Sequence, residues 1–103
     1  MTENQYKTEL IKKLKCMFPG CVILKNDPAQ QQGILDLIIL YGSTWATLEV
    51  KASADSSIRP NQRYFVREFD DMSFAAFIYP ENEAEVLDAL QQAFTSSRRA
   101  CIS

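Results

Sequence analysis

The sequence predicts an α/β fold in which helices flank a mixed β-sheet. Two apolar runs separated by Gly42-Ser43 predict a β-hairpin over residues 34–51, because a two-residue connection beginning with glycine is typical of a type II′ turn. A helical pattern over 60–70 then leads to an apolar run at 74–79, as in a crossover that returns to the sheet. With helices before the hairpin and at the end, the expected order is α-β-β-β-α-β-α.

The first helix is predicted over residues 3–17, where apolar side chains recur on one helical face. Pro19-Gly20 ends it. Residues 21–25 are typical of a short apolar strand, and residues 26–33 of a loop. The apolar stripe of the helix consists of Tyr6, Leu10, Leu14 and Met17, with Ile11 beside it.

The second half of the chain begins with Pro60, which suits the first turn of the helix over 60–70. The last helix is predicted to open at Pro80, because early glutamates favour the positive end of a helix. We expect one domain over residues 1–95 and a flexible tail at 96–103. The core stripe of the last helix is Val86, Leu87, Leu90 and Phe94.

Composition excludes several kinds of chemistry. The 103 residues contain no histidine, which excludes Ser-His-Asp and Cys-His catalysis. The three cysteines form neither a CxxC pair nor an even disulfide set, so we expect reduced thiols, no zinc site and a cytoplasmic protein. No apolar run approaches the length of a membrane helix, so no membrane partner is expected.

The net charge is −2, which by itself does not suggest a nucleic-acid-binding protein. The excess acid, however, lies in residues 80–103, which carry two basic and four acidic side chains. A basic surface elsewhere on the molecule is therefore compatible with the composition.

Charged residues interrupt the two apolar runs of the hairpin. If Tyr41 pairs with Thr44 across the turn, Asp36 lies directly opposite Glu49, and the two side chains share a face of the sheet. Lys51 lies two residues beyond Glu49 and therefore on that face as well. Two carboxylates so close repel one another, so the register predicts a cation between them.

Two further polar side chains are predicted to face these charges. Glu3 falls near the centre of the apolar stripe of the first helix, whereas Glu9 lies well to its side, so Glu3 is the preferred additional metal ligand. Helix N-termini also favour a glutamate for electrostatic reasons alone. Gln62 shares a helical face with Phe65 and Phe69, so it points inward, either to a structural hydrogen bond or to the charged site.

Basic side chains near the predicted site are candidate DNA contacts. Arg59, Arg63 and Arg67 form a ridge along the second helix that could be simply solvated or could bind phosphates. Lys25, at the end of the first strand, is a weaker candidate. A further group, Lys12, Lys13 and Lys15, is most simply a solvated helix face.

The motif of this hairpin resembles that of the PD-(D/E)xK nuclease superfamily. Gly33-Ile34-Leu35-Asp36 and Leu48-Glu49-Val50-Lys51 follow a helix that carries an acid, and the order α-β-β-β-α-β matches the restriction-endonuclease-like core. Pro60-Asn61-Gln62 resembles the glutamine-bearing helix of the VRR-NUC group and of archaeal Holliday junction resolvases. The resemblance covers roughly residues 3–79, and the compact form is similar to phage-encoded members.

This resemblance implies that Asp36 and Glu49 hold Mg²⁺ or Mn²⁺ with the Val50 backbone carbonyl, and that Glu3 contributes directly or through water. Lys51 would orient the attacking water or offset charge in the transition state, and Gln62 would position the nucleophile or the DNA. The expected activity is endonucleolytic hydrolysis of DNA leaving a 5′-phosphate, selective for branched, flapped or junction DNA.

Two other functions remain open at this point. The chain could be a non-catalytic nucleic-acid-binding module on the same fold, or a structural domain in which Lys51 pairs with Glu49 and Asp36. A homodimer is expected for the nuclease, because one small chain offers little DNA-contacting surface beyond its site. If the protein is phage-encoded, it acts in the cytoplasm of the bacterial host.

Overall fold

The fold was analysed in a computed structural model, which describes residues 1–26 and 35–102, with side chains described up to residue 96. Most of the predicted loop at 26–33 thus lies outside the described residues. Within them the order of elements is the predicted one. The elements are α1 (Glu3–Met17), β1 (Val22–Lys25), β2 (Leu37–Tyr41), β3 (Thr44–Val50), α2 (Pro60–Met72), β4 (Ala75–Ile78) and α3 (Glu83–Ile102).

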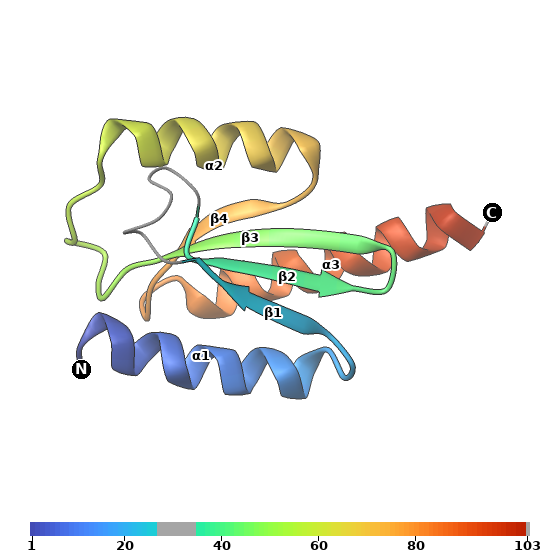
Figure 1. The fold of residues 1–103 in the computed structure, drawn as a ribbon, viewed down its shortest axis with the longest axis horizontal. Coiled ribbons are helices and arrows are strands. Elements are labelled where there is room, and N and C mark those ends of the chain that lie inside the picture. The colour runs from blue at the N-terminus through green and yellow to red at the C-terminus, as the bar shows by residue number, and fades with distance from the viewer. Residues whose placement is uncertain (27–34, 103) are drawn as a thin grey trace.

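The strands form one sheet in the order β1-β2-β3-β4 (Figure 1). The first three strands are antiparallel neighbours. β4 runs parallel to β3 after the α2 crossover. The predicted mixed sheet flanked by helices is confirmed.

The turn between β2 and β3 sets the register of the sheet. Gly42 has a φ of 61°, and Ser43 does not have a positive φ, as a type II′ turn requires. Tyr41 pairs with Thr44 and Leu37 with Leu48, so the predicted pairing is confirmed. Every second residue of β3 therefore shares its face with the opposite residue of β2.

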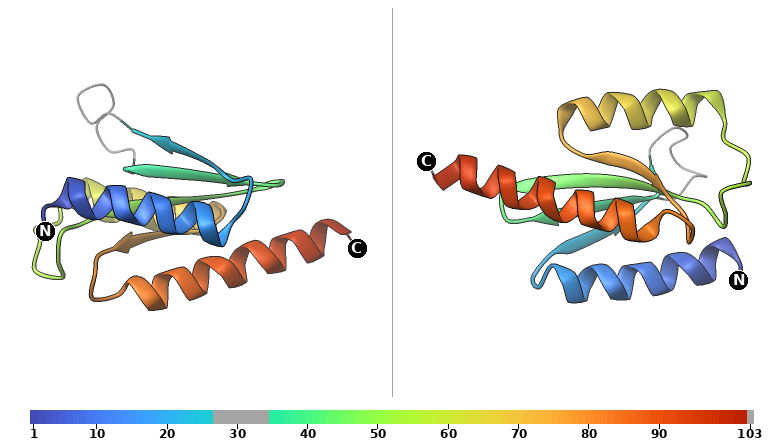
Figure 2. Two further views of the ribbon diagram at one scale, coloured as in Figure 1. Left: turned by 90° about the horizontal axis from the view of Figure 1, so that it is seen from below. Right: turned by 180° about the vertical axis from the view of Figure 1, so that it is seen from behind.

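Helices cover both faces of the sheet. Figure 2 shows α1 and α3 on one side, and Figure 1 shows α2 on the other. The main core lies on the α1/α3 side, where the stripe residues of both helices pack against alternate residues of β2 and β3. Its most completely buried side chains are Leu10, Leu14, Leu37, Ile39, Leu48, Val50, Ile78 and Leu90.

Contacts with α3 hold the N-terminal half of α1 in place. The hydroxyl of Tyr6, which is buried, donates to Glu83 Oε1 at 2.9 Å. Burial and this carboxylate raise the pKa of Tyr6. Lys13 forms an ion pair with the same carboxylate. These contacts fix the side of α1 that faces the end of the sheet.

The last helix differs from its prediction at both ends. It begins at Glu83 rather than Pro80, because Asn82 holds the preceding turn: its side chain accepts from Tyr79 N–H at 2.9 Å and donates to the Phe77 carbonyl at 3.1 Å. It continues to Ile102, past the end near residue 95 that we expected. No proline or glycine interrupts residues 83–102, which explains this extension. Among the described residues, no helix has both the length and the apolar character needed to cross a membrane.

The two edge strands of the sheet differ in whether side chains hydrogen-bond to their outward main-chain groups. On β4, the outward N–H of Ala75 donates to Asp70 Oδ1 at 3.1 Å, and Asn82 binds the outward groups of Phe77 and Tyr79. On β1, even-numbered residues face β2, as the bond from Asn26 N–H to the Asp36 carbonyl indicates. The outward main-chain groups of β1 belong to Ile23 and Lys25, which have no such side-chain cap within the part of the chain that the structure describes.

Candidate active site

The charged residues predicted for the site lie at one end of the sheet. β3 ends there and β2 begins there. The N-termini of α1 and α2 lie at the same end of the molecule (Figure 1). Because the N-terminus of a helix carries partial positive charge, both helices favour anions in this region.

Asp36 and Glu49 form a facing pair of carboxyl groups. Asp36 precedes β2, and the register of the hairpin continues to it, opposite Glu49. The two side chains are hydrogen-bonded to one another, which requires a proton between them. Burial, with only 6% of Glu49 exposed, and the charge of Asp36 raise the pKa of Glu49 to about 8. At neutral pH Glu49 therefore favours its protonated form in the metal-free protein.

The second oxygen of Asp36 binds the main chain of β3. Val50 N–H donates to Asp36 Oδ2 at 2.9 Å. The N–H and carbonyl of a strand residue point to the same side, so the Val50 carbonyl is directed toward this edge as well. The expected role of the Val50 carbonyl as a backbone metal ligand requires this direction.

Lys7 is a site residue that sequence reasoning missed. Its Nζ lies 3.2 Å from Asp36 Oδ1, and only 18% of the lysine side chain and 15% of the aspartate side chain are exposed. Lys7 follows Glu3 by one helical turn, on the same side of α1. The helical periodicity that directs Glu3 toward the sheet therefore directs Lys7 there as well.

Gln62 connects the remaining charged side chains. Its Nε2 donates to Glu49 Oε1 at 3.1 Å, and its Oε1 accepts from Lys51 Nζ at 3.0 Å. The same oxygen accepts from Arg59 N–H at 3.0 Å and so caps the first turn of α2. The prediction that Gln62 faces inward is confirmed, and Lys51 is joined to Glu49 through this amide.

Glu3 stands apart from the facing pair. It is exposed, yet its charge contributes to the raised pKa of Glu49, whereas Glu9 has no such effect. Within residues 1–26 and 35–96, no three carboxylates or thiols group together as a ready metal cluster.

The predicted DNA contacts lie outside this network. Arg59, Arg63 and Arg67 are all exposed on α2, and Arg59 touches the site only through its main chain. Lys25 pairs with Leu37, so its side chain lies on the α1 side of the sheet. Glu49 points toward α2, so Lys25 lies on the opposite face of the sheet from Glu49 and is not part of the charged network.

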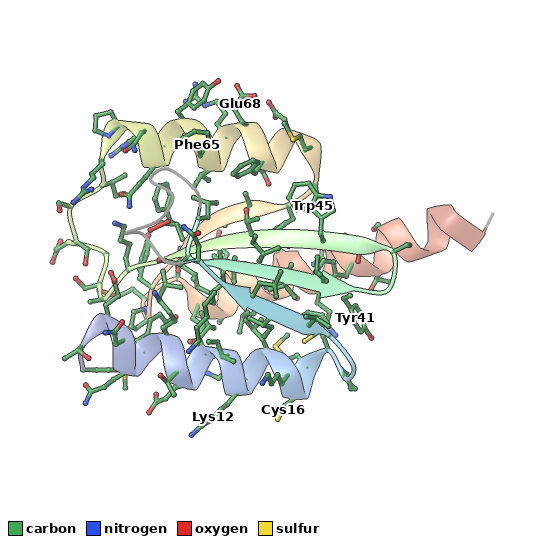
Figure 3. The ribbon with its side chains drawn as sticks, in the orientation of Figure 1. Lys12, Cys16, Tyr41, Trp45, Phe65 and Glu68 are labelled. Carbon is green, nitrogen blue, oxygen red and sulfur yellow. The ribbon has the colours of Figure 1, made fainter. Side chains whose placement is uncertain are left out.

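Aromatic side chains occupy the rest of the face beneath α2. Trp45 of β3 contacts Phe69 edge-on with centroids 6.4 Å apart, and Phe65 stacks on Phe69 at 5.8 Å (Figure 3). Glu68 points away from the sheet (Figure 3). No residue of α2 is fully buried, so this helix rests on a partly open layer beside the charged network.

The donor set fits a hard divalent cation. Asp36 and Glu49 supply carboxylate oxygens from adjacent strands, and these are the ligands that Mg²⁺ and Mn²⁺ prefer. Mg²⁺ commonly binds through one or two carboxylates and keeps several waters, so two acids and a carbonyl suffice. Comparison of the chain with models of protein families, with curated proteins and with solved structures finds no match in any of the three.

Proposed function

We propose that the protein is a divalent-metal-dependent DNA endonuclease of the PD-(D/E)xK type. The observation that supports this proposal is the facing pair of Asp36 and Glu49, where burial and the neighbouring carboxylate raise the pKa of Glu49. The mixed sheet in the order α-β-β-β-α-β supports the same proposal.

In this proposal Asp36, Glu49 and the Val50 carbonyl hold Mg²⁺ or Mn²⁺, with Glu3 acting through water. When bound, the metal supplies an activated water and polarises the phosphoryl oxygen. Glu49 loses its proton on loading, because a carboxylate must be ionised to serve as a ligand. Asp36 keeps its orientation through Val50 N–H.

In the proposed reaction Lys51 is the residue that acts on the phosphate. It is only 9% exposed and carries a positive charge two residues from Glu49, on the same face of β3. Gln62 holds its ammonium group at 3.0 Å and thus fixes its position. In the proposed reaction Lys51 offsets the charge that develops on the phosphoryl oxygens, and Gln62 positions Lys51.

The proposed substrate is DNA of branched, flapped or junction structure, cleaved by a homodimer. The N-termini of α1 and α2 lie at the same end of the molecule as the site (Figure 1) and add positive potential there. A cytoplasmic location and a phage origin belong to the same proposal.

A second candidate is a structural role for the charged network. Each group in it has a partner without a metal: Lys7 with Asp36, and Lys51 with Gln62. A network that is fully hydrogen-bonded can stabilise the end of a sheet on its own. In that case the protein would bind no divalent metal and would not cleave DNA. The non-catalytic nucleic-acid-binding module would bind DNA but would not cleave it either.

One experiment separates these functions. Wild type, Asp36→Asn and Lys51→Met are incubated with Mg²⁺ or Mn²⁺ and labelled linear, flap, fork and four-way DNA. The nuclease predicts metal-dependent cleavage by wild type alone, with both variants folded by circular dichroism. Cleavage that survives in both variants refutes it, and binding without cleavage favours the non-catalytic module.

A further inference from the structure

Three lysines from two different elements line one cleft on the α1 side of the sheet. The cleft lies between α1 and β1 and has a volume of about 280 Å³. Its lining combines these lysines with a hydroxyl and an apolar floor. The residues are Lys12, Lys15 and Lys25, with Thr8, Ile11 and Ile23.

The charges of this cleft are uncompensated within the described residues. Lys7 and Lys13 each form an ion pair, whereas the structure gives none to Lys12, Lys15 or Lys25. The lining contains no carboxylate. Lys12 extends from α1 toward solvent (Figure 3), so its ammonium group is free to bind an anion at the rim. In a chain of net charge −2, this concentration of positive charge is a local feature.

The position of the cleft connects it with the candidate site. Lys25 pairs with Leu37, the residue that follows Asp36, and Thr8 follows Lys7 on α1. From Thr8 to Lys15 the helix rises about 10 Å. This length corresponds to about three nucleotides of one strand of a B-form duplex.

We propose that this cleft binds the phosphate backbone of the nucleic acid as it leaves the candidate site. This inference rests on the proposed function and adds where the substrate runs: along α1 and β1 rather than over the exposed arginines of α2. Lysine ammonium groups bind phosphates as flexible point charges, and Thr8 and the isoleucines give the cleft its shape. The contacts involve the backbone only, so they carry no sequence preference.

The test compares two charge-matched triple variants. One replaces Lys12, Lys15 and Lys25 with glutamine, and the other replaces Arg59, Arg63 and Arg67 with glutamine. Binding of a labelled 20-base-pair duplex is measured against salt concentration, with Ca²⁺ in place of Mg²⁺. Each lost phosphate contact reduces the magnitude of the slope of log K against log salt by about 0.9. The slope of the lysine variant should therefore be smaller than that of wild type by about 2.7.

Lys13→Gln is the matched control, because Lys13 lies on the same helix but pairs with Glu83 instead of lining the cleft. Its salt slope should equal that of wild type. A second measurement needs no variant: in wild-type protein, DNA should protect Lys12, Lys15 and Lys25 from acetylation while Lys13 continues to react.

Several results would overturn the inference. One is that the lysine variant has the same salt slope as wild type and that DNA leaves Lys12, Lys15 and Lys25 as reactive toward acetylation as Lys13. Another is tighter binding of poly-glutamate than of DNA, which would make the cleft an acidic-peptide site. If DNA cleavage persists while the slope is unchanged, this inference alone fails. If wild type neither binds nor cleaves DNA, the proposed function fails with it.

Discussion

Lys7 of α1 and Asp36 before β2 form an ion pair at 3.2 Å, and this contact occupies the oxygen that a metal would need. The pair joins the first helix to the sheet at the candidate site. It also neutralises one carboxylate in the metal-free protein, while a proton neutralises the other. The same site can therefore be stable without a metal and still suit one.

Replacing Lys7 with methionine should strengthen metal binding. Without the ammonium group, a divalent cation at Asp36 and Glu49 no longer meets a like charge a few ångströms away. We expect about a tenfold lower dissociation constant for Mn²⁺ by calorimetry, with lower stability of the metal-free protein. Lys7→Arg is the control, because it keeps the charge. Equal affinity of the methionine variant and wild type would contradict the prediction.

Metal binding should depend on pH through Glu49. The pKa of this carboxyl is about 8 in the folded protein against an ordinary value of 4.5, so loading below pH 8 must release a proton. The affinity for Mn²⁺ should rise about tenfold per pH unit up to about pH 8 and then level off. A titration at several pH values checks this, and an affinity constant from pH 6 to pH 9 would contradict it.

The same pKa predicts how the stability of the metal-free protein varies with pH. Between about pH 4.5 and pH 8 the folded state holds a proton on Glu49 that the unfolded chain has lost. The contribution of Glu49 to the free energy of unfolding therefore falls as pH rises through this window. Glu49→Gln is the matched variant, because it cannot ionise. Urea unfolding should show a smaller fall for the variant, and Mn²⁺ should no longer raise its melting temperature.

Gln62 should matter more for stability than an ordinary half-exposed side chain. Gln62→Ala removes the cap of Arg59 N–H and leaves Lys51 and Glu49 without their shared partner. We expect a loss of about 2 kcal/mol in urea unfolding. Gln62→Glu keeps an acceptor for Arg59 and Lys51, and although it adds a carboxylate, Glu49 can donate to it below about pH 8, so it should lose less stability in that range. Equal losses for the two variants would show that the acceptor oxygen is unimportant.

Thr47 offers a prediction that is independent of function. Its side chain is 5% exposed, and its hydroxyl has no hydrogen-bond partner among the described residues. Thr47→Val removes this hydroxyl at nearly constant volume and suits a strand. We expect the free energy of unfolding to rise by about 1 kcal/mol. A destabilised valine variant would mean that the hydroxyl is solvated in the protein.

The hairpin was predictable because its geometry is local. Gly42 at a positive φ fixes the turn, and the turn fixes that Asp36 lies opposite Glu49. The inward direction of Gln62 followed from helical periodicity for the same reason. Whether these groups bind Mg²⁺ or act on DNA stays a prediction.

Features that depend on contacts between distant elements were not predictable. Lys7 meets Asp36 through the packing of α1 against the sheet and α3, to which the Tyr6–Glu83 contact contributes. The face of Lys25 depends on the register of β1 against β2, and no turn motif sets this register. The start of α3 was misplaced because Pro80 suits a first helical turn, while the side chain of Asn82 determines the actual boundary.

The different edges of the sheet limit how these chains can assemble. Asp70 and Asn82 block the outer side of β4, whereas Ile23 and Lys25 leave β1 open within the described residues. If two copies pair strand to strand through β1, the outward main-chain groups of β1 are hydrogen-bonded in both copies. Growth then stops at a pair, because a third chain would need the blocked side. The sheet thus permits a closed twofold assembly and resists open-ended fibres.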